Sequence, residues 1–478
     1  MSEENATSKQ PLIRFVNRKQ MSWRAVDVER LIGEDHPARA IWTLVGRLDL
    51  GRFYQGIESR VYAYSVGIGS AREVPRRCEY DPAFQWLTGL EEVNHHTLAD
   101  FRVEKRQELD ELFSQVLAAL SKEGLLTLDQ VMLDGTKIKA LASTRSFQRE
   151  GTIQGHLERA RKRVEELGDP RNEAASPKAK QAQARARREQ QERLAGALEE
   201  LEKLRARKTG EKAKSEARVS ISDPQARVMK QSDGGLALSY NAQISTDAAY
   251  GIIVDAAVTQ EANDSAQLLP AVDRVEQRLK KKLRQLVADG GYTTRDNIEK
   301  TAERDIDFLG SMRWENVPSG VTIPNRIPPS TFIYQPETNR HVCPEGKLLH
   351  SEGRHTRSPG LIYHRYQART KDCHACARKP ECCPNNEKRG RSVARAEESH
   401  TVVAFREKMA GEEARAQFCR RGRVVEFCHA WIKSKPGLRQ FHVRGLPKTQ
   451  TELLWACLTY NLQQWIRLRR LQTVPVSN

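Results

Sequence analysis

Three acidic residues lie in contexts where a carboxylate could do chemistry, and the first is Asp134 in the segment QVMLDGTKIKALAS. Val131, Met132 and Leu133 lead into this acid, a pattern that is typical of a buried strand. Burying an unpaired carboxylate is costly, so Asp134 requires either a basic partner or a metal ion. A nearby lysine such as Lys137 could be that partner, which leaves a purely structural ion pair as the alternative.

The second acid is Asp289 in the segment LVADGGYTT. It stands at the carboxyl end of a predicted strand, which is where open α/β sheets place their ligands. Gly290 and Gly291 remove side chains next to the acid and would let a substrate backbone come close. The alternative is an ordinary Asp-Gly turn.

The third acid is Glu426 in the segment FCRRGRVVEFCHAWIKSK, which is predicted to be a helix that packs on a sheet. Glu426 lies off the apolar stripe of this helix and shares a face with Lys433, two turns further on. The alternative is a solvated glutamate without any role in chemistry. The stripe consists of Val424, Val425, Phe427, Cys428, Trp431 and Ile432.

The surrounding pattern predicts the elements that would position these acids. Residues 37 to 125 are predicted to be helical, with a long helix from Thr97 and a turn at Gly89. Residues 236–247 and 250–259 predict an antiparallel pair of strands, followed by a helix over 265–282 and a buried strand before Asp289. This order of strands and helices is expected of a mixed α/β sheet.

Two segments are predicted to be insertions. Residues 151–217 are rich in Glu, Lys, Arg, Ala, Gln and Leu, with apolar residues at a/d spacing on either side of a turn, and predict a helical hairpin. It would contact DNA, mediate dimerisation, or act as a solvated spacer. Residues 321–400 are rich in Pro, Arg and Cys and show little periodicity.

Composition narrows the choice of partner and compartment. The formal net charge of +17 favours a polyanionic partner, with nucleic acid first. Because the chain has neither a long apolar run nor an N-terminal signal-peptide pattern, we expect it in the cytoplasm, associated with the nucleoid when bound to DNA.

Cysteines cluster in the second insertion, where reduced thiols would be expected in the cytoplasm. Cys373 and Cys376 form a CxxC pair, and together with Cys343 and either Cys382 or Cys383 they could complete a structural Zn²⁺ site. The alternative is reduced cysteines without a metal.

The chain as a whole resembles a known family. The stretches LDGTK, LVADGGY, VVEFCHAWIKSKPGLRQFHVRGL and ELLWACLTYNLQQW resemble, in this order, bacterial insertion-sequence transposases of the DDE type. HHTLADFR is similar to the N-terminal helical domain that precedes the catalytic core in that family. The resemblance spans about residues 30–145 and 220–470. It implies a ribonuclease-H-like core in which Asp134, Asp289 and Glu426 are the catalytic D, D and E.

The resemblance also implies roles for the residues around Glu426. Arg421 and Lys433 match the Arg that precedes the family's Glu and the Lys that follows it. The family's usual Tyr is absent, since Phe418 or Cys419 stands near its place. The three acids would hold Mg²⁺ or Mn²⁺, and in two-metal sites ions about 3.5–4 Å apart activate the attacking oxygen and stabilise the leaving one.

The implied activity is cleavage and strand transfer of DNA during transposition of an insertion sequence. The partners would be double-stranded DNA, both terminal inverted repeats and target, with a homodimer or higher assembly on DNA. A nuclease that does not join strands and an inactive DNA-binding derivative are the alternatives, and retention of all three acids disfavours the second. The expected DNA contacts are Arg421, Lys433, Arg439, Arg102 and Lys105.

The expected organisation has six parts. They are an N-terminal helical domain over 1–125 that binds DNA or docks on the core, the first core strand in 126–150, the hairpin in 151–217, the core in 218–320, the Cys-rich insertion in 321–400 and C-terminal catalytic helices in 401–478.

Overall fold

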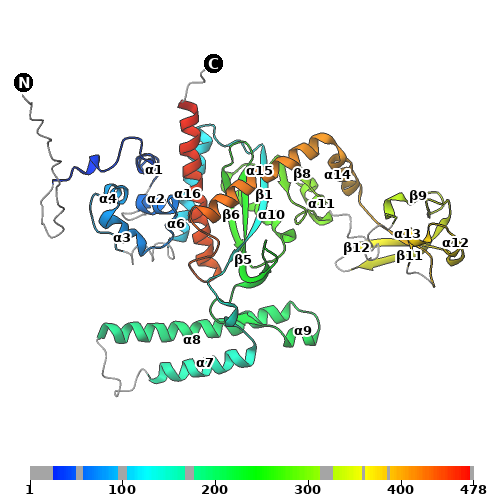
Figure 1. Cartoon of the computed structure of the whole chain (residues 1–478), viewed down its shortest axis with the longest axis horizontal. Coiled ribbons are helices and arrows are strands. Elements are labelled where there is room, and N and C mark those ends of the chain that lie inside the picture. Colours follow the sequence, from blue (N-terminus) through cyan, green and yellow to red (C-terminus); the bar gives the residue numbers. More distant parts are fainter. Residues whose placement is uncertain are drawn as a thin grey trace, which may run out of the picture.

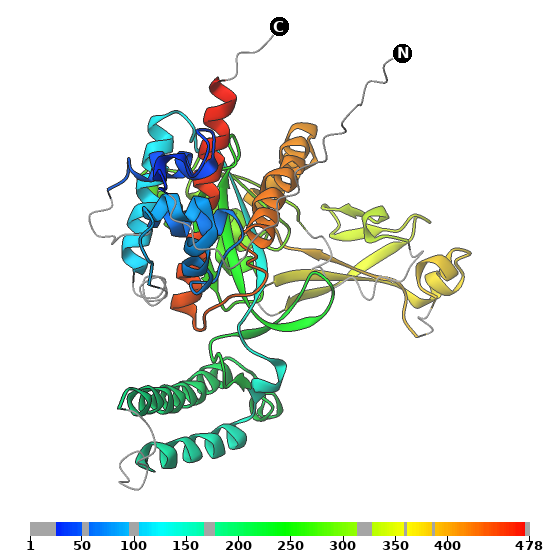
Figure 2. The ribbon, with the colours of Figure 1, turned by 60° about the vertical axis from the view of Figure 1, so that its left-hand side comes forward.

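The computed structural model describes residues 25–49, 57–94, 105–166, 177–312, 327–357, 361–384 and 388–473 of the chain. A central sheet carries helices on both faces (Figure 1). A two-helix hairpin extends from one end of the sheet, and a second, smaller sheet lies beyond the edge formed by β8 (Figures 1 and 2).

The central sheet is mixed. Its core strands are β1 (Gln130–Lys139), β5 (Leu236–Asp247), β6 (Ile253–Thr259), β7 (Gln285–Ala288) and β8 (Asp307–Gly310), with β4 (Arg227–Lys230) added beside β5. β5 is antiparallel to β1 and to β6, whereas β7 is parallel to β1 and to β8. The core strands therefore lie in the order third, second, first, fourth and fifth, and the predicted ribonuclease-H-like mixed sheet is confirmed.

Helices cover both faces because side chains alternate along each strand. On one face, Met132 of β1, Val287 of β7 and Leu309 of β8 pack against Val425 of α15 (Glu412–Ser434). The other face joins the main hydrophobic core, which also contains α10 (Leu268–Leu279) and α16 (Leu446–Thr473). Asp134 alternates in step with Met132, so it faces α15.

The N-terminal helices belong to this main core. They are α1 (Pro37–Val45), α2 (Ile57–Ser65), α3 (Glu73–Tyr80), α4 (Pro82–Thr88) and α6 (Arg106–Lys122). Tyr64 of α2 stacks on Trp455 of α16, with ring centroids 6.3 Å apart. The long helix predicted to begin at Thr97 begins instead at Arg106, with Lys105 as its N-cap, and residues 95–104 lie outside the described part. Gly89 ends α4 with a φ of 62°, as the predicted turn requires.

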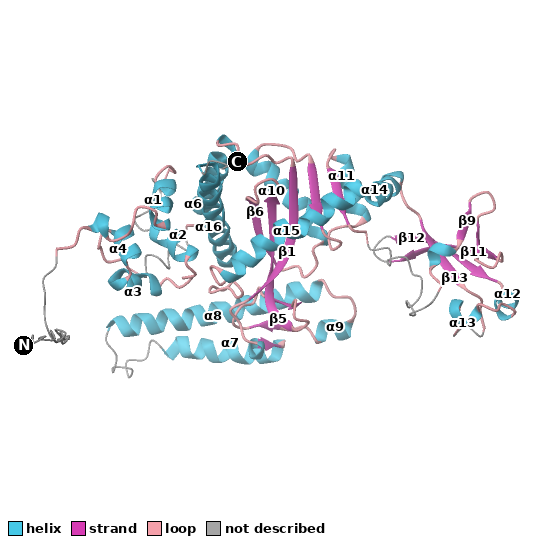
Figure 3. Cartoon of the chain, turned by 45° about the horizontal axis from the view of Figure 1, so that its top comes forward, coloured by secondary structure: helices cyan, strands magenta, loops and turns pink. Residues whose placement is uncertain are grey.

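The predicted hairpin is formed by α7 (Glu150–Glu165) and α8 (Pro177–Ala206), with the short α9 (Glu211–Ser215) after it. Figure 3 shows the two long helices side by side below the sheet. A narrow apolar seam holds them together and includes Leu157, Leu194 and Leu201. The two-stranded pair β2 (Phe147–Gln148) and β3 (Val219–Ser220) closes the base of the hairpin.

The Cys-rich segment forms a five-stranded antiparallel sheet of its own. Its strands are β9 (Ile333–Gln335), β10 (Arg340–Val342), β11 (Leu348–Arg357), β12 (Leu361–Ala368) and β13 (Ser392–Ala396). The sequence shows no clear alternation here because most side chains of β11 are exposed and few strand positions are buried. The short helices α12 (Thr370–His374) and α13 (Lys379–Cys382) lie between β12 and β13.

Two further helices complete the core. α11 (Arg295–Glu303) connects β7 to β8, and α14 (His400–Ala410) leads from the Cys-rich sheet back to α15. None of the helices in the described ranges is both long enough and apolar enough to cross a membrane.

Candidate catalytic site

Asp134 and Asp289 lie level with each other on neighbouring strands. The parallel register pairs Leu133 of β1 with Ala288 of β7, and each aspartate is the next residue along its strand direction. Their carboxylates are close enough for the charge of Asp289 to raise the pKa of Asp134. The structure therefore brings together two of the three predicted acids, which are far apart in the sequence.

Asp134 is largely buried, with a side-chain exposure of 18%. Burial, opposed by Arg421 and reinforced by the charges of Asp289 and Asp264, raises its pKa to about 6. Its Oδ2 lies 3.1 Å from Nη1 of Arg421 and 3.9 Å from Nδ1 of His429, both on α15. The basic partner of Asp134 is therefore Arg421, and the alternative of a nearby lysine partner is wrong.

His429 adds no compensating charge at neutral pH. Burial, with Lys433 and Arg421 nearby, lowers its pKa to about 4. Its Nε2 and the Nε of Arg421 are buried without a hydrogen-bond partner among the described residues. Both orphaned groups belong to side chains that contact Asp134, so the polar network around this carboxylate is incomplete.

Asp289 is positioned by the turn that follows β7. The backbone N–H of Gly291 donates to its Oδ1 at 2.7 Å, and the N–H of Tyr292 donates to its backbone oxygen at 3.1 Å. The Asp-Gly turn that was the alternative interpretation of this segment is thus present, and it holds the carboxylate beside Asp134. Burial and the nearby acids also raise the pKa of the Tyr292 hydroxyl, which donates to Gln243 Oε1.

A further acid, Asp264, lies beside these two and was not among the candidates from the sequence. Its Oδ1 accepts hydrogen bonds from Asn241 Nδ2 at 2.6 Å and Gln243 Nε2 at 2.8 Å, and lies 3.5 Å from Nζ of Lys137. Lys137 therefore pairs with Asp264. The only sequence signal is a polar turn, QEANDS, between β6 and α10, because nothing local indicates that it folds over β1.

Two glycines make room for the acids. A Cβ on Gly135 would lie 2.6 Å from Oδ1 of Asp264, and a Cβ on Gly291 would lie 2.9 Å from Oδ1 of Asp289 and 3.5 Å from Oδ2 of Asp264. Real Cβ atoms do not approach polar atoms so closely. Both positions thus need glycine if the three aspartates are to converge.

Glu426 lies on the same helix as Arg421 and His429, but its side chain is exposed. Its Oε1 lies 3.5 Å from the position that a Cβ on Gly422 would occupy. Among the interactions of the described residues, Glu426 makes no contact with Asp134 or Asp289. One turn separates it from His429, so the backbone places it next to the site while the side chain turns away.

The basic residues that were predicted to contact DNA differ in their exposure and in their distance along the chain from the acids. Lys433 is half-buried, and its pKa is lowered by burial and by Arg439 while Asp134 opposes this shift. Arg439 is exposed, in the segment that runs beside the end of β1, where Lys139 N donates to its carbonyl at 3.1 Å. Lys105 precedes α6, with its Nζ 2.7 Å from Glu108 Oε1. Arg102 lies outside the described residues.

The donor set is suited to a hard divalent cation. Mg²⁺ and Mn²⁺ prefer carboxylate oxygens. Burial, together with the charges of Asp289 and Asp264, raises the pKa of Asp134, and a bound cation would oppose this shift. Within the described ranges, no three His, Cys, Asp or Glu side chains stand at the mutual spacing of metal ligands. Metal binding would thus require side-chain movement, and Glu426 is the acid with most freedom to move.

One comparison with known proteins agrees with the resemblance stated above, over the C-terminal part of the chain. Residues 342–466 match the family model of the transposase DDE domain, a segment that includes Glu426 but not Asp134 or Asp289. No curated protein matches the chain. Among solved structures, it is similar to a cryo-EM structure of the piggyBac transposase synaptic complex with hairpin DNA. That similarity has a TM-score of 0.28 and 7% identity, and it covers 94% of this chain and 82% of the other.

Proposed function

We propose, from the transposase DDE domain that the chain resembles over residues 342–466, that it is a DDE transposase that cleaves DNA and joins strands during transposition of an insertion sequence. The observation that supports this most directly is the pair Asp134 and Asp289, level on neighbouring parallel strands and within reach of each other's charge. Paired carboxylates at the end of parallel strands, facing a helix rich in basic residues, suit metal-assisted phosphoryl transfer.

Asp134, Asp289 and Glu426 would hold the metal. Bound Mg²⁺ or Mn²⁺ supplies an activated water or 3′-hydroxyl and stabilises the leaving oxygen of an in-line displacement at phosphorus. The contribution of the protein is positioning. Gly291 N–H holds the carboxylate of Asp289, and the Arg421 guanidinium holds that of Asp134, while α15 presents Glu426 one turn from His429.

Glu426 would reach the site by rotation of its side chain. Its Cα belongs to a helix whose Val425 is buried on the sheet, so the backbone is anchored while the carboxylate is exposed. Catalytic contacts in ligand-free structures are often loose and tighten when the reactants bind. Attraction between the carboxylate and a cation beside Asp134 would supply the force for this rotation.

Asp264 would act as a positioning residue. Its Oδ1 is occupied by Asn241 and Gln243, and its Oδ2 faces the space beside Gly291. This arrangement orients Lys137 and holds the loop before α10 against the site. Groups that support the surroundings of a metal site typically contribute about 10–100-fold to activity or metal affinity, so we expect a loss of that size from Asp264→Asn.

DNA phosphates would lie along the basic side of α15. Arg439 and Lys433 are close enough for one charge to lower the pKa of the other, which produces a local positive potential. Lys433→Ala should weaken binding to all duplexes alike. It should also reduce the slope of the logarithm of the DNA association constant against the logarithm of the salt concentration by about one. The further proposals are double-stranded terminal-repeat and target DNA as partners, assembly of at least a homodimer on DNA, and a cytoplasmic, nucleoid-associated location.

The test is an assay of cleavage and joining. The purified chain is incubated with Mg²⁺ or Mn²⁺, a labelled duplex that carries the terminal repeat of its element, and a supercoiled target plasmid. We expect nicking at the element end and covalent joining to the plasmid. Asp134→Asn, Asp289→Asn and Glu426→Gln should abolish both steps with DNA binding nearly unchanged.

Glu413→Gln is the matched control, because Glu413 is exposed on the same helix and accepts from Gln417 at 3.2 Å. It should cleave like the wild type. Cleavage without joining would identify a nuclease, and binding without cleavage an inactive DNA-binding derivative. Full cleavage by either aspartate variant would refute the site.

A further inference from the structure

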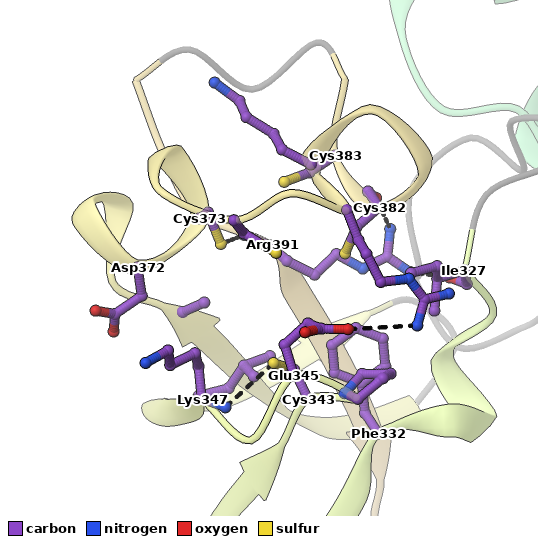
Figure 4. A pocket seen from close by; sticks show the side chains of 16 residues that line it. Ile327, Phe332, Cys343, Glu345, Lys347, Asp372, Cys373, Cys382, Cys383 and Arg391 are labelled. Atoms are coloured by element: carbon purple, nitrogen blue, oxygen red, sulfur yellow. Dashed lines mark hydrogen bonds and ion pairs between the residues drawn. The ribbon is translucent and has the colours of Figure 1, made fainter.

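Five cysteines line one small cavity in the Cys-rich sheet (Figure 4), which lies far from β1 of the central sheet (Figure 1). The cavity has a volume of about 30 Å³. One water needs roughly 10–15 Å³ on this measure, so the space admits an ion or one or two waters but no organic ligand. The cysteines are Cys343, Cys373, Cys376, Cys382 and Cys383.

Three of the thiols come from two tight backbone turns, while Cys382 is the last residue of α13. Cys343 opens the loop between β10 and β11, where its N–H donates to the carbonyl of Lys347 at 2.9 Å and Gly346 adopts a φ of 72°. Cys373 and Cys376 lie on one helical turn, where the N–H of Cys376 donates to the carbonyl of Cys373 at 3.3 Å. These turns direct sulfur atoms from separate parts of the chain towards the same cavity (Figure 4).

Two of the sulfur atoms already accept backbone hydrogen bonds. Lys347 N–H donates to Sγ of Cys343 at 3.3 Å, and Arg391 N–H donates to Sγ of Cys373 at 3.3 Å. Donors of this kind favour the thiolate over the thiol. Burial, with the neighbouring Cys383 and Cys376, raises the pKa of the Cys373 thiol, and the Arg391 N–H opposes this shift.

Positive charge lines the same cavity. The Arg391 side chain belongs to a residue that is only 4% exposed, and it donates to the carbonyls of Cys382 at 3.1 Å and Ile327 at 3.0 Å. Lys347, Arg378 and Lys379 also line it, together with the acidic residues Glu345, 3.6 Å from Arg378, and Asp372. Four thiolates around Zn²⁺ carry a net charge of −2, which a buried guanidinium and surrounding ammonium groups would offset.

The sheet also lacks an adequate apolar core. Its buried apolar cluster consists of six side chains: Ile327, Phe332, Leu349, Tyr366, Ala368 and Val393. Small units below about 70–80 residues rarely have enough core for stability and usually depend on a metal or disulfides. Cys343, Cys373 and Cys382 pack directly on this cluster, so bonds from these three sulfur atoms to one metal ion would cross-link the cluster on that side.

We propose that Cys343, Cys373, Cys376 and Cys382 bind one structural Zn²⁺ that stabilises this sheet. Each thiol releases its proton as the metal binds, and the four sulfur atoms take up tetrahedral positions. Since no three described side chains are now at ligand spacing, binding requires rotation of the cysteine side chains into the cavity. We take Cys382 as the fourth ligand because it packs on the apolar cluster with Cys343 and Cys373; Cys383, which interacts with Cys373, is the alternative that the serine variants distinguish.

The zinc site does not rest on the proposed function, because its residues lie in a separate sheet. The site would hold rigid the segment that separates Asp289 from Glu426, because β13 is followed by α14 and then by α15, which carries Glu426. A chain that binds zinc here but does not cut DNA would leave this proposal intact and refute the transposase.

The test measures metal in the purified full chain. It is prepared under reducing conditions without a metal-affinity tag and dialysed against Zn²⁺-free buffer before elemental analysis. We expect about one zinc per chain, as for a structural four-cysteine site. Ser substitution at any of the four cysteines should remove most of it, whereas Cys376→His, which keeps a ligand nitrogen, should retain it.

Three controls separate the alternatives. Cys419→Ser alters an exposed cysteine on α15 and should keep the zinc. Asp134→Asn should also keep it, which excludes zinc bound at the carboxylates. Cobalt substitution of the wild type should give the intense sulfur-to-metal absorption of tetrahedral thiolate coordination.

Absence of zinc from the wild type, or a disulfide among these cysteines in the freshly reduced protein, would overturn the proposal. So would zinc loss in Cys383→Ser without loss in Cys382→Ser, since the fourth ligand would then be wrong. Loss of zinc in Cys376→His and Asp134→Asn alike would indicate non-specific binding and would equally overturn it.

Discussion

Replacing Asp134 by Asn should stabilise the metal-free protein while abolishing metal binding. Asp134 is largely buried beside Asp289 and Asp264, and its pKa is raised from 3.8 to about 6. The folded state therefore binds the Asp134 proton more tightly than the unfolded state does. Ionisation of this carboxyl lowers the free energy of unfolding as the pH rises from about 4 to about 6, and the full penalty persists at neutral pH.

The size of the penalty follows from the shift. One pKa unit corresponds to about 1.4 kcal/mol, so a rise from 3.8 to about 6 costs on the order of 3 kcal/mol at pH 7. The Asp134→Asn substitution would remove the charge but leave Arg421 without a carboxylate partner, which offsets part of the gain. We therefore expect the Asn variant to be about 1–3 kcal/mol more stable than the wild type at pH 7 in chelator.

The assay is denaturant unfolding of the full chain at pH 4 and pH 7, with chelator or with Mn²⁺. The advantage of the Asn variant should be present at pH 7 and shrink at pH 4. Mn²⁺ should stabilise the wild type and leave the variant unchanged, because the variant lacks the Asp134 carboxylate that the ion needs in addition to those of Asp289 and Glu426.

Asp129→Asn is the control. Asp129 is exposed near the start of the same strand, 3.5 Å from Arg284, so this substitution should change stability by less than about 1 kcal/mol, and the change should be a loss. The reasoning would be refuted if Asp134→Asn were no more stable than the wild type at pH 7, or if Mn²⁺ stabilised both proteins equally.

Two other changes test the packing around the site. Gly135→Ala should displace Asp264, because the added Cβ would lie 2.6 Å from its Oδ1, and we expect a loss of about 1–3 kcal/mol in unfolding together with reduced cleavage. The matched control is Gly155→Ala in helix α7, where nothing lies within 4 Å of the new Cβ and stability should rise by up to about 1 kcal/mol; equal effects of the two substitutions in thermal melts would contradict the steric explanation. Arg274→Ala should cost about 3–5 kcal/mol, because Asp255 is 1% exposed and its Oδ2 lies 2.8 Å from Nε of Arg274, and a loss under 1 kcal/mol in denaturant unfolding would show that the pair is dispensable.

The sequence alone determined features that depend on local periodicity. The apolar run before Asp134 predicted its strand, and the runs at 236–247 and 250–259 predicted β5 and β6. The stripe in 424–432 predicted the buried side of α15, and its members Val425, Cys428 and Ile432 are buried as expected. Phe427 is the most exposed member, at 54%, and its ring lies against Tyr460 of α16, with centroids 6.3 Å apart, rather than on the sheet.

Tertiary structure decided which polar groups meet. Asp264 lies in a polar turn, and only the fold of that turn over β1 brings it to Asn241, Gln243 and Lys137. Arg421 became the partner of Asp134 for the same reason, since α15 crosses β1 nearly three hundred positions further along the chain. No local pattern encodes such a contact, because it depends on how whole elements pack.

Asp134, Asp289 and Glu426 show which features of the site follow from the sequence and which depend on the tertiary structure. Periodicity indicates which face of a strand or helix is buried, because burial repeats every two or about 3.6 residues. It placed Asp134 and Asp289 at strand positions, and the parallel register of β1 and β7 then set them side by side. Neither periodicity predicts where an exposed side chain such as that of Glu426 points. Its direction depends on the neighbouring charges and on the ligand that the site binds.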